Sequence, residues 1–134
     1  MKLNEKDRNE LIKYRIEQAK ETFSVIELLI DNGKYPTAFN RIYYGIFYSL
    51  LALGLKYEFE TSKHQQLIGW FNKEFVHSGK IEKEFGKTLR NAFENRTISD
   101  YDAFIEFEKE DLIELFAEMK LFIRRIETFL KSEK

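Results

Sequence analysis

Hydrophobic positions recur at helical spacing along almost the whole chain. Between Asn4 and Asp31 they form one stripe at intervals of three or four residues, made of Ile12, Ile16, Ala19, Phe23, Ile26 and Ile30. This period is typical of an amphipathic helix with one buried face. The sequence DNG then predicts its end, because Gly33 suits the left-handed conformation that follows many helices.

The stretch from Pro36 to about Leu55 is apolar nearly all round, which predicts the most buried helix of the fold. Pro36 suits the first turn, where its missing N–H costs nothing. One face carries small residues within a narrow arc, namely Ala38, Gly45, Ser49 and Ala52. Such a face lets another helix approach closely, and Arg41 and Tyr48 lie beside it on the helical wheel.

Three further helices are indicated. One starts at Ser62, where Ser62 and Gln65 match a capping box, and it ends at the sequence HSGK. Another covers about Ile81 to Asp100. The last covers about Glu108 to Leu130, with acidic residues in its first turn and basic ones in its last turns, as the helix dipole favours. We therefore predict an all-α fold, an antiparallel bundle of four to five helices forming one domain over residues 1–134.

Composition limits the classes of function. Hydrophobic residues make up 43% and charged residues 34%, which is typical of a globular protein with a real core. Because the net charge is −1, any binding of nucleic acid must depend on a local basic patch. The polar start MKLNEKDRNE does not resemble a signal peptide, and the longest apolar stretch, 42–55, is too short to span a bilayer. We expect a cytoplasmic protein that does not enter membranes.

Common catalytic signatures are missing. The chain has no cysteine, and neither His64 nor His77 has a glutamate three residues before it, as a di-iron bundle would require. The sequence GKT at 86–88 lacks the preceding glycine of a phosphate-binding loop. We expect no metal and no cofactor. His64 has two interpretations: a general base or phosphate contact, or an ordinary polar residue at a helix start.

The end of the fourth helix, FENRTISDYD, carries the most informative charges. On a helical wheel Arg96 falls in the centre of the apolar stripe and Asp100 falls on it too, so the two are expected to pair across one turn. Three interpretations compete. The pair fixes the chain exit; or Arg96 and Arg90 bind phosphate in a groove; or Arg41 joins Arg96 at a subunit interface.

Three segments together resemble the HEPN domain family, the higher eukaryote and prokaryote nucleotide-binding proteins. AFNRIYYGIFYSLLALGL (38–55) resembles the signature second helix, SKHQQLIGWF (62–71) is similar to the Lys-His start of the third, and LRNAFENRTISDYD (89–102) is similar to the Arg-x-x-x-Asp-Tyr helix end of an uncharacterised prokaryotic branch. The resemblance extends from about Leu11 to Leu130. It implies a helical bundle that forms a homodimer and is often encoded beside a minimal nucleotidyltransferase, as a toxin–antitoxin pair.

Active members of the family are metal-independent endoribonucleases that use an arginine followed four to six residues later by histidine. In this chain Arg96, and less closely Arg90, match that arginine, but Arg96 is followed by Asp100 and Tyr101. An aspartate there repels phosphate and occupies the arginine. Tyr101 lies near the position of a tyrosine that the partner modifies with nucleotide in some members.

The leading hypothesis is therefore a HEPN-type protein that acts by binding, with a nucleotidyltransferase partner and a nucleotide or RNA pocket formed by Arg41, Arg96, Asp100 and Tyr101. The alternatives are a ribonuclease toxin, in which Arg96 and Arg90 act with His64 or Tyr101, and a structural dimerisation module.

Overall fold

The computed structural model describes residues 3–101 and 106–133. The helices within them are α1 (Glu5–Asp31), α2 (Tyr35–Lys56), α3 (His64–Phe71), the π-helix η1 (Asn72–Val76), α4 (Lys83–Tyr101) and α5 (Lys109–Ser132), and these residues include no strand. The predicted all-α bundle is confirmed, and most predicted ends lie within two residues of the observed ones. The third helix starts two residues later than predicted and continues into η1.

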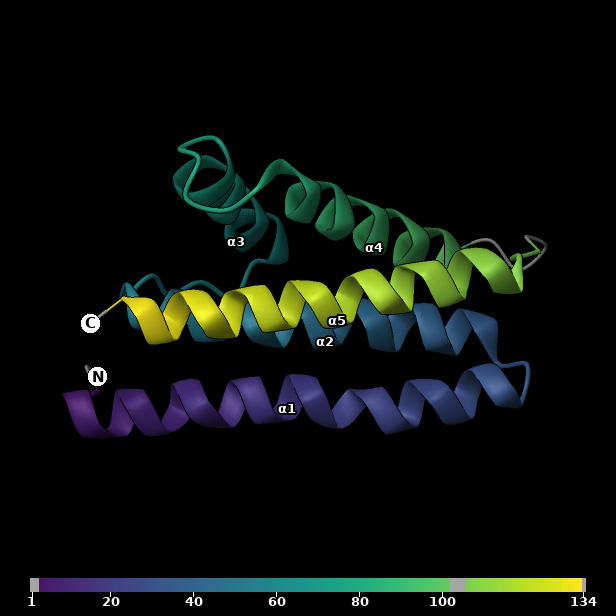
Figure 1. Cartoon of the computed structure of the whole chain (residues 1–134), viewed down its shortest axis with the longest axis horizontal. Coiled ribbons are helices and arrows are strands. Elements are labelled where there is room, and N and C mark those ends of the chain that lie inside the picture. The colour runs from purple at the N-terminus through teal and green to yellow at the C-terminus, as the bar shows by residue number, and fades with distance from the viewer. Residues whose placement is uncertain (1–2, 102–105, 134) are drawn as a thin grey trace.

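The helices pack around α2. Figure 1 shows α1 and α4 on opposite sides of α2 and α5, with the short α3 at one end of the molecule. In chain direction α1 is antiparallel to α2, and α4 is antiparallel to α5. Because α2 contacts α1, α3, α4 and α5, its apolar circumference is buried on most sides.

The small face of α2 meets its neighbours at close range. A Cβ atom added at Gly45 would collide with the side chain of Met119 from α5 and would lie 2.8 Å from Thr22 Oγ1 of α1. Ala38, Ser49 and Ala52 on the same face are fully buried. The predicted close approach therefore occurs within this chain, against α1 and α5.

Local signals explain where α1 begins and ends. The side chain of Asn4 accepts a hydrogen bond from the Asp7 N–H at 2.8 Å, which satisfies one of the free donors of the first turn. At the other end Gly33 adopts φ 70°, and the Lys34 N–H donates to the Leu29 carbonyl at 2.8 Å. This closes the helix as the sequence predicts.

The capping box predicted at Ser62 is wrong. The third helix begins at His64, and its N-cap residue, Lys63, makes no side-chain capping bond. Thr61 organises this turn instead, because its hydroxyl accepts from the Lys63 N–H at 3.1 Å and donates to Gln66 Oε1 at 2.7 Å. The shift places His64 in the first turn of α3, on the side of α2.

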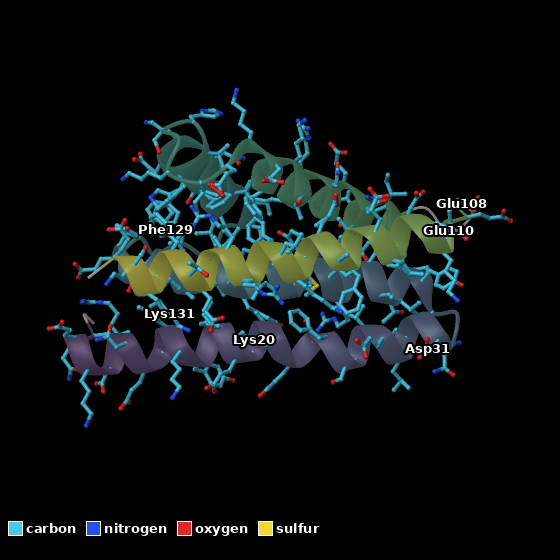
Figure 2. The ribbon with its side chains drawn as sticks, in the orientation of Figure 1. Lys20, Asp31, Glu108, Glu110, Phe129 and Lys131 are labelled. Atoms are coloured by element: carbon cyan, nitrogen blue, oxygen red, sulfur yellow. The ribbon has the colours of Figure 1, made fainter. Side chains whose placement is uncertain are left out.

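Two contacts of α5 hold the layers together. Phe129 lies on the α3 side of α5 and meets the ring of Phe75 in η1 at 5.5 Å, edge to face (Figure 2). On the α1 side, Lys20 approaches Glu127 of α5 at 2.7 Å; within α5 itself, Lys131 lies 4.0 Å from the same carboxylate. The aromatic contact contributes more than these partly exposed ion pairs.

Candidate functional site

An aromatic cluster on α2 receives the start of α3. The hydroxyl of Tyr43 and Nδ1 of His64 are hydrogen-bonded at 2.8 Å. The ring of Phe47 stacks on the imidazole with centroids 3.9 Å apart and an interplanar angle of 15°. Tyr43 is fully buried, whereas His64 is only half-buried. The imidazole is therefore fixed in position by its neighbours while one side remains open to solvent.

Arg96, from the last turns of α4, lies against the same cluster. Its guanidinium carbon is 5.4 Å from the ring centre of Tyr43 and 5.6 Å from that of Tyr44. One of its terminal nitrogens, Nη2, donates to the Tyr44 hydroxyl at 3.4 Å. Such cation–π contacts favour a charged group that has lost part of its hydration. Arg96 is 24% exposed, so it is half-buried and not fully inside the core as its wheel position suggested.

Asp100 stands beside Arg96, one turn further along α4. Its Oδ2 lies 2.9 Å from Nε of Arg96, so the predicted pairing is present. The N–H of Nε does not point at that oxygen, and this buried donor has no hydrogen-bond partner among the described residues. Nη1 likewise makes no hydrogen bond to a described residue. The arginine is therefore charge-paired but keeps the donors of Nη1 for a further oxygen, whereas Nε is too deeply buried to meet a ligand.

These side chains border an open groove of about 640 Å³ between α3 and α4, which we call the Arg96 groove. It is lined by Tyr44, Lys63, His64, Gln65, Gln66, Phe93 and Arg96. Two of the lining residues are cations and none is acidic. A groove with this lining favours an anion with a flat or apolar part, since Phe93 and Tyr44 offer ring surface beside the charges.

The protonation states follow from burial. Loss of water and the nearby positive charge of Arg96 both lower the pKa of His64 from 6.5. Burial raises the pKa of Tyr43 to about 12, although Arg96 acts in the opposite direction. At neutral pH the imidazole is therefore mostly neutral and the phenol keeps its proton.

We predict that replacing Arg96 by glutamine raises the pKa of His64, because it removes a nearby positive charge. NMR titration of the imidazole C–H signals measures this directly, and Arg124→Gln, an exposed change on α5, serves as the control that leaves the pKa unchanged. In the wild type the folded pKa lies below the unfolded value of about 6.5. The neutral imidazole therefore contributes stability above that pH, which is lost as the pH falls through the folded pKa. A wild-type midpoint at or above 6.5 would contradict this account.

The structure brings only some of the predicted site residues together. Arg96 and His64 line one groove, with Asp100 at its edge. Arg41 contacts the Tyr44 ring at 5.0 Å, so Tyr44 lies between two guanidiniums, but Arg41 does not line the groove. Arg90 is exposed and lines a neighbouring groove. Tyr101, the last residue of α4, is 82% exposed and lines neither groove, so its part in the expected pocket stays a prediction.

Sequence reasoning missed other residues of the site. Tyr43 and Phe47, which hold His64, were noted only as part of an apolar helix and of the family signature. Lys63 and Phe93 also line the groove. The tyrosine pair in RIYYGIF was the available signal, since two adjacent phenols on a buried helix need partners.

Two properties of the described residues bear on the kind of site. Within the described residues, no three His, Asp or Glu side chains lie close enough to hold a metal ion. Among the helices of residues 3–101 and 106–133, none combines the length and apolar character of a membrane span.

Comparison with known proteins gives one consistent family. The HEPN domain model matches residues 12–129. A UPF0332 protein of Thermotoga maritima is 36% identical, over 98% of this chain and 98% of its own length. Two proteins of Methanocaldococcus jannaschii, each with the name "Putative toxin", are 36% and 32% identical over 95% and 88% of this chain, and over 94% and 80% of their own. Together with the helical bundle, these matches show that the chain belongs to the HEPN domain family.

Proposed function

We propose that this HEPN protein acts by binding, and that the Arg96 groove holds a phosphate group of a nucleotide or RNA. One observation carries the proposal: Arg96 lies half-buried on two tyrosine rings with the N–H donors of Nη1 unused, in a groove whose lining contains Lys63 and no acid. Guanidinium donors of this kind match phosphate oxygens. The ring surfaces of Tyr44 and Phe93 suit a base beside the phosphate.

The proposal includes partners. The names of the M. jannaschii relatives support a toxin-like role for this chain. On the family resemblance, the protein forms a homodimer and works with a minimal nucleotidyltransferase in a toxin–antitoxin-like module. Arg41 and Tyr44, both half-buried on α2, lie beside the groove and are the residues through which a second subunit could meet Arg96.

A second candidate function, metal-independent RNA cleavage, is favoured by the shared position of His64 and Arg96. A neutral imidazole can accept the proton of a 2′-hydroxyl as its oxygen bonds to the adjacent phosphorus. The phosphorus–O5′ bond then breaks and the 5′-oxygen takes up a proton, while arginine stabilises the added negative charge. Asp100 opposes this reaction, because its carboxylate lies 2.9 Å from the arginine that would have to meet the phosphate.

The experiment that separates the two functions uses purified wild-type protein with fluorescein-labelled RNA in EDTA. Binding is followed by anisotropy, and the strand is then run on a denaturing gel. We expect saturable, salt-sensitive binding and intact RNA. Cleavage that His64→Ala abolishes would establish the ribonuclease instead. Neither binding nor cleavage would refute both, and co-purification with the product of an adjacent nucleotidyltransferase gene tests the partner separately.

A further inference from the structure

A second and larger groove continues from the Arg96 groove along α4. It measures about 760 Å³, lies between α4 and the α3–η1 segment, and we call it the α4 groove. Gln65 and Phe93 line both grooves, so the two grooves adjoin on the protein surface, and together we call them the channel. The residues Lys83, Lys87 and Arg90 line its α4 side, and Ile68, Val76 and Phe93 give it an apolar floor.

Charge distinguishes this channel from the rest of the molecule. Its lining residues, all in the described part of the chain, include Lys63 and Arg96 in the first groove and Lys83, Lys87 and Arg90 in the second, with no aspartate or glutamate in either. The whole chain carries a net charge of −1. None of Lys83, Lys87 and Arg90 forms an ion pair with a described residue. These three cations, which have no ion-pair partner among the described residues, therefore lie together in the groove next to the proposed phosphate site.

The backbone also departs from regular geometry at this groove. η1 is a π-helical turn in which the His77 N–H donates to the Asn72 carbonyl at 2.8 Å, and Asn72, Val76 and His77 all line the groove. Such turns are rare in α-helices and occur often at functional sites. Opposite η1, a Cβ added at Gly86 would lie 3.4 Å from Val76, an ordinary contact distance, so α4 and η1 are near neighbours across the groove.

We propose that both grooves bind one single-stranded polynucleotide. One of its phosphates lies at Arg96, and the neighbouring nucleotides lie in the α4 groove. This inference rests on the proposed function and names its ligand class: a strand, and not a mononucleotide. A row of cations suits the repeating phosphates of a strand, and an apolar floor suits unstacked bases, which a duplex does not expose. An acidic protein segment would pair with the cations, but its carboxylates would not stack on the ring of Phe93 as a base does.

The test compares the dinucleotide UpU with oligo(U) and oligo(dT) of about a dozen nucleotides, a length in the range of single-strand sites. Affinities are measured by anisotropy, or by competition for UpU. We expect the strands to bind at least about tenfold more tightly than UpU, since they reach several more cations. Equal affinities for RNA and DNA would show that the groove reads phosphate and base alone, and a preference for RNA would add contacts to the 2′-hydroxyl.

Two variants probe the groove itself. The triple variant Lys83→Gln, Lys87→Gln, Arg90→Gln should weaken strand binding about tenfold and reduce the slope of log affinity against log salt by about 2, because three cations are removed. The control, Lys6→Gln, Lys13→Gln, Lys109→Gln, makes the same charge change at exposed positions outside both grooves. Gly69→Leu changes no charge, meets nothing within 4 Å at its Cβ, and fills the α4 groove from the α3 side. It should weaken the strand but not UpU.

Each outcome decides a claim. If UpU and the strands bind equally and neither groove variant matters, while Arg96→Ala weakens both, the inference fails and the proposed function stands. If the groove variants weaken the strand and Arg96→Ala does not, the α4 groove is a strand site and the proposed function fails. Absence of nucleic-acid binding overturns both the inference and the proposed function. Both also fail if the wild type binds an acidic partner protein instead of RNA and the triple variant loses that partner. Circular dichroism confirms that each variant is folded.

Discussion

Replacing Tyr43 by alanine is expected to lower the free energy of unfolding by about 3–5 kcal/mol, the range for removing a large buried ring. Tyr43 is fully buried, and its ring meets those of Tyr44, Phe47, His64 and Phe93 at 5.4–6.1 Å. No neighbour can fill the space without leaving its own contacts. Because the same ring supports Arg96 at 5.4 Å, the variant should also lose order at the site.

Tyr43→Phe is the matched control for this prediction. It keeps the ring and removes only the hydroxyl that bonds Nδ1 of His64, so the expected loss is about 0.5–1.5 kcal/mol. Urea unfolding followed by circular dichroism measures both values. Equal losses for the two variants would show that the hydrogen bond, and not the packed ring, holds α2 and α3 together here.

Helix positions could be predicted because the signals are local. The stripe on α1, the glycine at its end and the apolar circumference of α2 each reflect interactions within a few residues. The start of α3 was misplaced because two polar residues compete there, and Thr61, not Ser62, makes the bonds of the turn. η1 has no comparable signature, because a single π turn changes the spacing of apolar residues too little to be recognised in the sequence.

The site could be predicted only where its partners lie on one helix. Arg96 and Asp100 are one turn apart, so the wheel placed them together. The bond between Tyr43 and His64 joins residues 21 positions apart, and the meeting of Arg41 and Arg96 on Tyr44 joins α2 to α4. These contacts depend on how helices pack, which periodicity does not fix. Lys87 belongs to the incomplete phosphate-loop sequence GKT, which indicates no site. It nevertheless lines a basic groove, because it shares one face of α4 with Lys83 and Arg90.

Asp100 is the residue on which the binding and structural interpretations differ. Asp100→Asn removes a carboxylate that lies 2.9 Å from Arg96 Nε and is 31% exposed. Its cost in stability should be small, about 1 kcal/mol or less, because the pair is partly exposed to water. If Arg96 binds phosphate, the variant should bind the strand more tightly. A lower melting temperature with unchanged affinity would favour a purely structural pair.

The largest expected effect on binding belongs to Arg96. Removing one charge-assisted contact costs about 1.5–3 kcal/mol, which is roughly a 10- to 100-fold loss of affinity. Arg96→Ala also frees Asp100, whose unpaired carboxylate would then repel phosphate. The loss should apply to UpU and to oligo(U) alike, because both place a phosphate at this residue.

The affinity of Arg96→Ala for UpU, measured beside that of Arg124→Ala, shows whether Arg96 binds phosphate. Arg124 is an exposed arginine of α5 that lines neither groove, so the control makes the same change in net charge away from the site. We expect at least about a tenfold loss for Arg96→Ala and nearly wild-type affinity for Arg124→Ala. Equal affinities in two folded variants would contradict it, because the half-buried arginine would then hold the helix end and bind no phosphate.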